Sequence, residues 1–242
     1  LNGQYIPGVP INDPLDLIPQ SEITVSSTLH FKGFDRVDFW KTLTTPSAQL
    51  FPILKGELPV FNVAVNATKP TTFKASLRIS KRAGGFTPDL TLASREIEIQ
   101  AGEQNINLDF GVNLLDSSYV FVVFEANEAI QLGFTEKRVT GILSVFNSIN
   151  KAVSNFGKQM PPADAGVDEF EFWCPQRRPQ GQNLAISLAK PQPVFDKSNL
   201  TNGIDRPVRQ PNAWVADPTD ASPSLIFEWD EAKTIKQIDL WF

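Results

Sequence analysis

The stretch Phe73-Lys74-Ala75-Ser76-Leu77-Arg78-Ile79-Ser80 places an apolar side chain at every second position. Successive side chains of a β-strand point to opposite faces of a sheet, so this period predicts a strand with one buried and one solvated face. The same alternation recurs between Pro59 and Asn66 and again from Ile97 to Phe110. The run Tyr119–Phe124 is apolar throughout, which predicts a central strand buried on both faces.

Many short strands separated by turn residues are typical of sandwiches and jelly rolls. We therefore expect a mostly β chain with two antiparallel β-sandwich or jelly-roll units. A short helix near residues 147–156 is the expected exception, because Phe146, Ile149, Val153 and Phe156 follow one another at intervals of three and four residues.

The composition changes along the chain predict its organisation. Residues 1–20 are interrupted by prolines and are expected to form an extended arm or linker. The first β-sandwich is predicted over 21–150, the helix end and a linker over 151–165, and a second, incomplete β unit over 166–242. The chain starts with Leu1 and its last strand pattern continues to its end, so we expect a segment of a larger protein.

The charges exclude several classes of function. The chain has 22 Lys and Arg residues against 27 Asp and Glu residues, and its formal net charge is −5. It contains no basic stripe, which argues against a nucleic-acid partner. Its apolar runs fall short of the ~20 residues that a membrane helix needs, so we predict no membrane span.

Residues that often carry catalysis are few in this sequence. The single cysteine, Cys174, and the single histidine, His30, lack evident partners and are interpreted as structural. The paired acids Glu96 and Glu98 share one face of a predicted strand, and we interpret that face as solvated. We therefore assign no catalytic residue to this chain.

Several short motifs follow one another after residue 182: Asn183-Leu184-Ala185, Asn199-Leu200-Thr201-Asn202-Gly203, Arg206-Pro207, Asn212-Ala213-Trp214 and Leu225-Ile226-Phe227-Glu228-Trp229. Together they resemble the front half of a discoidin-like (coagulation factor 5/8 type C) galactose-binding jelly roll. The resemblance implies that the Asn-Gly turn and the tryptophan lie at the ligand-facing or calcium-facing end of the domain.

Two candidate sites are expected in this segment. Trp214 lies in a polar loop and could stack on a sugar ring, with Asn212 and Arg206 as further ligand-binding residues. Carboxylate and amide oxygens in loops suit Ca²⁺, and the candidate ligands are Asp196, Asn199, Asn202 and Asp205. The alternative for these four residues is that their side chains shape a turn.

Motifs across nearly the whole chain include Tyr5–Pro10, Phe86–Asp89, Arg138–Val145 and Phe170–Trp173. They resemble the C-terminal extension of bacterial FAD-dependent oxidoreductases, in which a flavin domain precedes β-sandwich modules. The resemblance implies that FAD is bound upstream and not in this chain. In agreement, no Gly-x-Gly-x-x-Gly fingerprint follows a predicted strand.

We therefore expect a non-catalytic accessory or recognition module of a larger FAD-dependent oxidoreductase. Its partners would be the upstream catalytic domain and a glycan substrate. A stand-alone carbohydrate- or surface-binding β-sandwich protein is the alternative, and a glycoside hydrolase fragment is a weaker one. A periplasmic or secreted location is favoured.

Overall fold

The computed structural model describes residues 22–82, 85–151, 153–154, 157–158, 171–175, 181–202, 207 and 210–236. Its regular structure is almost entirely β, together with the 3₁₀ helix η1 (Lys197–Leu200). The strands are β1 (Glu22–Val25), β2 (Phe31–Gly33), β3 (Phe39–Leu43), β4 (Ser47–Ile53), β5 (Gly56–Glu57), β6 (Phe61–Ala67), β7 (Thr71–Ile79), β8 (Leu90–Ile99), β9 (Gly102–Leu108), β10 (Asn113–Leu114), β11 (Ser118–Phe124), β12 (Asn127–Thr135), β13 (Phe146–Lys151), β14 (Val153–Ser154), β15 (Gly157–Lys158), β16 (Glu171–Pro175), β17 (Asn183–Leu184), β18 (Ile186–Gln192) and β19 (Leu225–Glu228).

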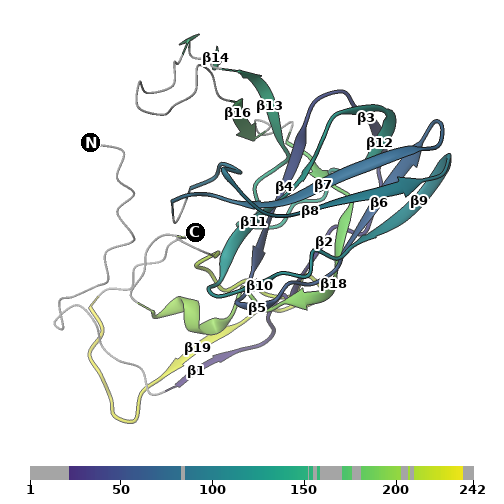
Figure 1. Ribbon diagram of the computed structural model, residues 1–242. Helices are drawn as coiled ribbons and strands as arrows, with labels where there is room; N and C mark the ends of the chain where they lie inside the picture. The colour runs from purple at the N-terminus through teal and green to yellow at the C-terminus, as the bar shows by residue number, and fades with distance from the viewer. Residues whose placement is uncertain are drawn as a thin grey trace.

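Two antiparallel sheets form the body of the fold in a sandwich-like arrangement (Figure 1). One sheet has six strands in the order β16-β13-β4-β11-β7-β8. The other has seven strands: β17-β12-β6-β18-β2 follow one another, β3 pairs with β12, and β9 pairs with β6. The predicted mostly β, antiparallel fold class is confirmed.

The inward-facing side chains of both sheets share one apolar core. On β6, Phe61, Val63 and Val65 are buried while the residues between them are partly exposed, as their alternation predicts. Phe61 meets Phe51 of the opposite sheet, with 5.3 Å between the ring centroids. Burial of such rings is a large apolar contribution to the free energy of folding, and it fixes which face of each sheet points to solvent.

The helix predicted near residues 147–156 is wrong, because β13 and β14 occupy this part of the chain. Phe146 pairs with Ala48 of β4, and its ring contacts that of Phe121 edge to face at a centroid distance of 5.2 Å. Phe146 and Ser148 are both buried, which is the period of a strand. Pairing with β4, which is distant in sequence, thus outweighs a local helical spacing.

The predicted division into a unit of 21–150 and a unit of 166–242 does not match the sheets. β16 pairs with β13 in the six-stranded sheet, and β17 and β18 pair with β12 and β6 in the seven-stranded sheet. β1, close to the start of the described chain, pairs with β19 close to its end. Strands from both predicted units therefore form common sheets. Strands that are distant in sequence are hydrogen-bonded neighbours in these sheets, so the predicted boundary does not separate two units.

Gln49 of β4 links the two sheets inside the molecule. Its side chain is fully buried. Its Oε1 accepts a hydrogen bond from the backbone N–H of Leu184 at 3.0 Å, and its Nε2 donates to Oδ1 of Asn183 at 3.2 Å. The Nδ2 of Asn183 in turn donates to the carbonyl of Lys137 at 2.8 Å. These buried amides are satisfied by one another across the predicted domain boundary.

The last strand of the six-stranded sheet, β8, carries an exposed arginine that bonds to the neighbouring chain. Arg95 lies opposite Ala75 of β7, a buried position. Its guanidinium donates to the carbonyls of Asp109 and Phe110, both at 2.7 Å, and so connects β8 to the chain that follows β9. The pairing of β8 with β7 also shifts register beside Leu77. Arg95 therefore closes one side of the sandwich.

The predicted arm of residues 1–20 and most of the predicted linker of residues 151–165 lie outside the described residues. Within the described chain, no helix combines the length and the apolar character that crossing a bilayer requires.

Candidate functional site

A groove with a volume of about 760 Å³ lies on the outer face of the seven-stranded sheet. Its lining comes from the β2–β3 connection and from strands β3, β6, β9 and β18. Strands far apart in sequence thus contribute to one surface, which is the usual arrangement of a ligand site on a rigid sheet.

Small residues form the floor of the groove at the point where β6, β12 and β18 meet. Ala64 and Ala185 line it, and the backbone N–H of Ala64 donates to the carbonyl of Ala185 at 3.1 Å. A Cβ on Gly133 would lie 3.2 Å from the Cβ of either alanine and 2.8 Å from Val37. Glycine at this position therefore lets the β2–β3 connection pack down beside the floor.

Two aromatic residues line the groove, the buried Phe34 and the partly exposed Trp40. Trp40 lies on β3 directly opposite Gly133, so its side chain shares the outer face of the sheet with the floor residues. It is partly exposed and lines the groove. A partly exposed indole beside methyl groups offers a flat apolar surface with one hydrogen-bond donor.

Carboxamide and hydroxyl groups form the opposite wall. Asn62 of β6 is in register with Asn107 of β9 and with Ser187 of β18, and Asn105 is in register with Ala64. Among the described residues, the side chains of Asn62, Asn105 and Asn107 have no hydrogen-bond partner. Each carboxamide can donate and accept, so this wall is suited to a ligand rich in hydroxyl groups.

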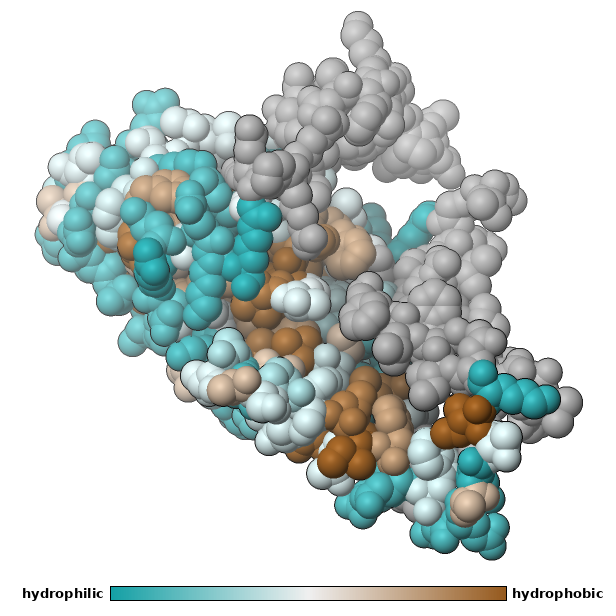
Figure 2. Space-filling model, turned by 180° about the vertical axis from the view of Figure 1, so that it is seen from behind, coloured by the Kyte–Doolittle hydropathy of each residue, from teal (hydrophilic) through white to brown (hydrophobic). Residues whose placement is uncertain are grey.

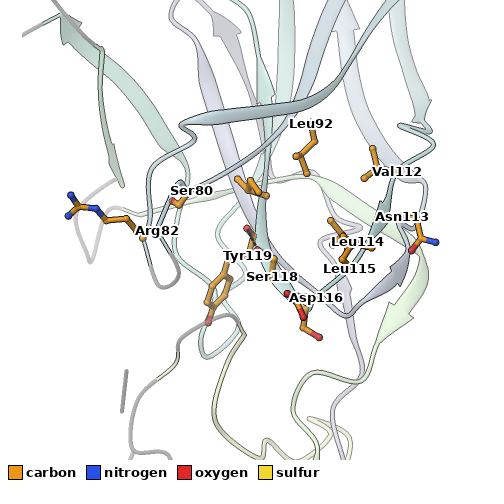
Figure 3. A pocket seen from close by; sticks show the side chains of 13 residues that line it. Ser80, Arg82, Leu92, Val112, Asn113, Leu114, Leu115, Asp116, Ser118 and Tyr119 are labelled. Atoms are coloured by element: carbon orange, nitrogen blue, oxygen red, sulfur yellow. Dashed lines mark hydrogen bonds between the residues drawn. The ribbon is translucent and has the colours of Figure 1, made fainter. Parts of the chain in front are cut away.

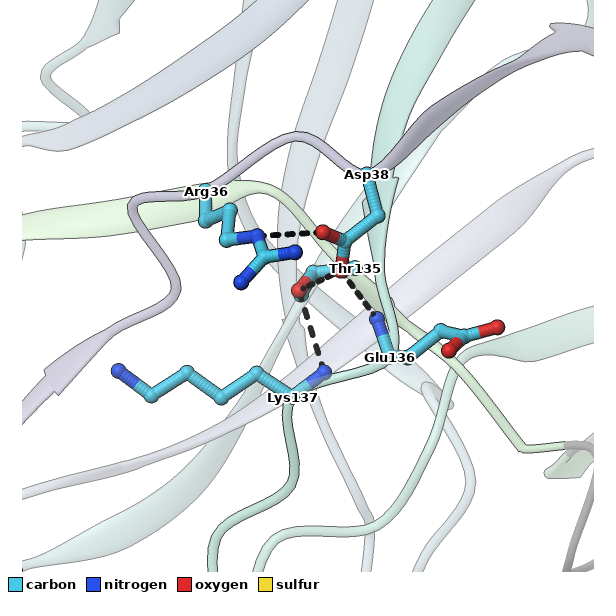
Figure 4. Close-up of polar contacts among 5 residues, drawn as sticks. All are labelled: Arg36, Asp38, Thr135, Glu136 and Lys137. Carbon is cyan, nitrogen blue, oxygen red and sulfur yellow. Dashed lines mark hydrogen bonds and ion pairs between the residues drawn. The ribbon is translucent and has the colours of Figure 1, made fainter.

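A cluster of polar contacts fixes the connection that carries Trp40 (Figure 4). The carboxylate of Asp38 accepts hydrogen bonds from the Thr135 hydroxyl at 2.8 Å and the Glu136 backbone N–H at 2.9 Å, and it pairs with Arg36. The Thr135 hydroxyl also accepts from the Lys137 backbone N–H at 3.1 Å. The bonds from Glu136 and Thr135 hold the pKa of Asp38 below its ordinary value. The end of β12 thus anchors one side of the groove.

The two sheets differ in the chemistry of their outer faces. On β7 and β8 the outward positions include the ion pair between Lys74 and Glu96, whose charged atoms are 3.8 Å apart. On the seven-stranded sheet the register aligns neutral polar residues, and Asn66 donates to Gln131 at 3.0 Å. These residues are Thr42, Asn62, Asn66, Asn105, Asn107, Gln131 and Ser187. The same face also carries Glu103, in register with Asn66, so its polar side chains are mostly but not entirely neutral.

Trp214, predicted to meet a ligand, packs against the connection between β1 and β2. Its Nε1 donates to the Ser27 carbonyl at 3.0 Å and to the Thr28 hydroxyl at 3.2 Å. The Oδ1 of Asn212 accepts from the Nδ2 of Asn202 at 2.7 Å. The structure thus gives Trp214 and Asn212 protein partners, and Arg206 lies outside the described residues.

The predicted calcium ligands are engaged in local hydrogen bonds where they are described. Asp196 caps η1, accepting from the Ser198 backbone N–H at 2.9 Å, and this contact with Ser198 lowers the pKa of Asp196. Asn199 is buried and donates to two backbone carbonyls, both at 3.0 Å. Asp205 lies outside the described residues. No group of three or more His, Cys, Asp or Glu side chains is placed to hold a metal ion in the described part of the chain.

A second hollow, of about 420 Å³, lies between the ends of β7, β8, β10 and β11. Leu92, Leu114 and Leu115 surround it, whereas Arg82 extends away from it (Figure 3). Leu115 is 92% exposed. Apolar residues also gather near the centre of the face seen in Figure 2, while hydrophilic residues cover the end formed by β3, β6, β9 and β12. Polar residues such as Ser80, Asn113 and Asp116 also line this hollow, which is smaller than the groove.

Comparisons of the chain with family models, with curated proteins and with solved structures found no match. The residues of the groove are therefore the basis for assigning a ligand. Trp40, Asn62, Asn105 and Asn107 are not among the site residues predicted from the sequence. One available signal was the alternation from Phe61 to Asn66, in which the outward positions carry asparagine and alanine instead of charged residues.

Proposed function

We propose that this chain is a recognition module that binds a saccharide in the groove of the seven-stranded sheet. The observation that carries the proposal is the placement of Trp40 beside a floor of small residues, facing a wall of Asn62, Asn105 and Asn107. A pyranose ring has one apolar C–H face and a rim of hydroxyl groups. The face suits an indole and the rim suits carboxamides that both donate and accept.

The same geometry suggests modest affinity. Each ligand hydrogen bond contributes about 0.5–1.5 kcal/mol net, because water is displaced on both sides. The groove is open along one side of the sheet and covers a ligand incompletely. A dissociation constant between about 10 μM and 1 mM corresponds to such a site, that is, a binding free energy of about −7 to −4 kcal/mol.

The resemblance to the C-terminal extension of FAD-dependent oxidoreductases supplies a context for this activity. In that context the module would hold a glycan close to an upstream catalytic domain that binds FAD. A stand-alone carbohydrate-binding protein would use the same groove. Both versions of the proposal predict the same saccharide contacts in this chain.

The test is titration of the purified chain with a panel of neutral mono- and oligosaccharides, followed by ¹⁵N–¹H chemical shifts and tryptophan fluorescence. Trp40→Ala is expected to weaken binding at least tenfold with little change in melting temperature, since Trp40 is partly exposed. Trp214→Ala is the matched control from the other predicted site, and its affinity should be unchanged in the folded fraction. Loss of binding in Trp214→Ala with retention in Trp40→Ala would overturn the assignment of the groove.

A further inference from the structure

The charged residues that line the groove are all of one sign. Asp35 and Glu103 are the charged residues that line it, and both are acidic. The remaining lining residues are neutral amides, hydroxyls, small residues and aromatics. A ligand held against Trp40 and the asparagine wall therefore meets carboxylates at the edge of the site and no cation in direct contact among the described residues.

The two carboxylates are not equivalent. Asp35 is paired with Lys32, whose Nζ lies 3.5 Å from its carboxylate. Burial opposes the ionisation of Asp35, yet its backbone hydrogen bond and the charges of Lys32 and Lys137 lower its pKa overall. Asp35 therefore has cationic neighbours and forms an ion pair with Lys32.

Glu103 has no such compensation among the described residues. It follows Gly102, whose φ of +105° forms the tight turn into β9. Its register partner on β6 is Asn66, and Asn66 is already bonded to Gln131 at 3.0 Å. Opposite residues share a sheet face, so the Glu103 carboxylate is exposed on the same outer face as Asn105 and Asn107.

We propose that Glu103 makes the groove select neutral or amino-substituted sugars over sugars that carry a carboxylate. This inference rests on the proposed saccharide site and adds the charge class of its ligand. The reason is Coulombic: an acidic sugar beside an uncompensated carboxylate is repelled, and an ammonium group on the sugar is attracted. For an exposed pair a few ångströms apart the expected discrimination is about three- to tenfold at low ionic strength, and it shrinks as salt is added.

The experiment uses two matched series of sugars: glucose, glucosamine and glucuronate, and galactose, galactosamine and galacturonate. Each is titrated into the whole chain at 20 mM and at 500 mM NaCl, at a pH where glucosamine is protonated. The wild-type chain should bind the uronate of the better series at least threefold more weakly than the neutral sugar, and this ratio should approach one in high salt.

Variants assign the effect to one residue. Glu103→Gln should abolish the discrimination and Glu103→Lys should reverse it, while both retain binding of the neutral sugar. Glu98→Gln, an exposed acid on the outer face of the other sheet, is the matched control and should behave as wild type. Equal or tighter binding of the uronate by the wild type, or an unchanged ratio in Glu103→Gln, refutes the selectivity alone. If none of the six sugars binds, the saccharide site itself is refuted, and the selectivity with it.

Discussion

Replacing Gln49 by methionine is expected to destabilise the whole chain. The substitution keeps nearly the same side-chain volume, so little cavity forms. It removes the acceptor of the Leu184 backbone N–H and the donor to the Asn183 Oδ1, both of which are buried contacts in the structure. The backbone carbonyl of Leu143, 3.1 Å from the Gln49 Nε2, loses a donor as well.

The size of the effect follows from these lost partners. A buried donor or acceptor left without a partner costs about 1–3 kcal/mol. With Leu184 and Asn183 both affected, we expect the free energy of unfolding to fall by about 2–6 kcal/mol. For a domain of this size each kcal/mol corresponds to about 2–4 °C, so the melting temperature should drop by at least about 4 °C.

The assay is urea unfolding followed by circular dichroism and by tryptophan fluorescence, together with a thermal melt. Because Gln49 bridges strands on both sides of the predicted boundary, both probes should report one shared transition, shifted to lower urea. Gln104→Met is the matched control, since the Gln104 Nε2 donates to the Gln100 carbonyl in an exposed contact. A loss below about 1 kcal/mol in Gln49→Met, or a loss equal to that of the control, would show that the buried amides do not join the two sheets.

Three further outcomes are expected. The folded-state pKa of Asp38 is lowered, so its contribution to stability is present above the unfolded pKa of about 3.9 and is lost as the pH falls below it. Melting temperatures measured between pH 6 and pH 2.5 should therefore fall less steeply for Asp38→Asn than for the wild type. Parallel curves for the two proteins would contradict this. Phe121→Ala should cost about 3–5 kcal/mol in urea unfolding, because Phe121 is fully buried against Phe146; Leu115→Ala, at a side chain that is 92% exposed, should stay within about 0.5 kcal/mol and serves as its control. Asp196→Ala should cost about 1 kcal/mol through loss of the cap on η1; if Asp196 is instead a calcium ligand, Ca²⁺ would raise the melting temperature of the wild type and leave that of the variant unchanged.

The strands predicted correctly from the sequence are those that show an alternation of apolar and polar residues within the strand itself. The alternation from Phe73 to Ser80 and from Pro59 to Asn66 already specifies which residues are buried on β7 and β6. The spacing from Phe146 to Phe156 is that of a helix, yet residues Phe146–Lys151 form β13. This strand is decided by pairing with β4, about a hundred residues earlier in the chain, which no local pattern reveals.

The location of the candidate site depends even more on contacts between residues that are distant in sequence. Trp214 and Trp40 both lie in mixed polar surroundings in the sequence. The indole N–H of Trp214 donates to the carbonyl of Ser27, 187 residues away, whereas Trp40 pairs with Gly133 of β12 and lines the groove. The register of one strand against another thus decides which tryptophan can meet a ligand. For the same reason, composition alone placed a domain boundary where the sheets are continuous.

Arg95 has a consequence for self-association of this protein through an edge strand. β8 ends a sheet and spans Leu90–Ile99, long enough to template the strand of a neighbouring molecule. A strand docking there would meet a backbone distorted by the register shift, and it would have to displace a guanidinium held by two carbonyls. The register shift and the Arg95 contacts therefore make the open edge of β8 a less regular template for the strand of another copy.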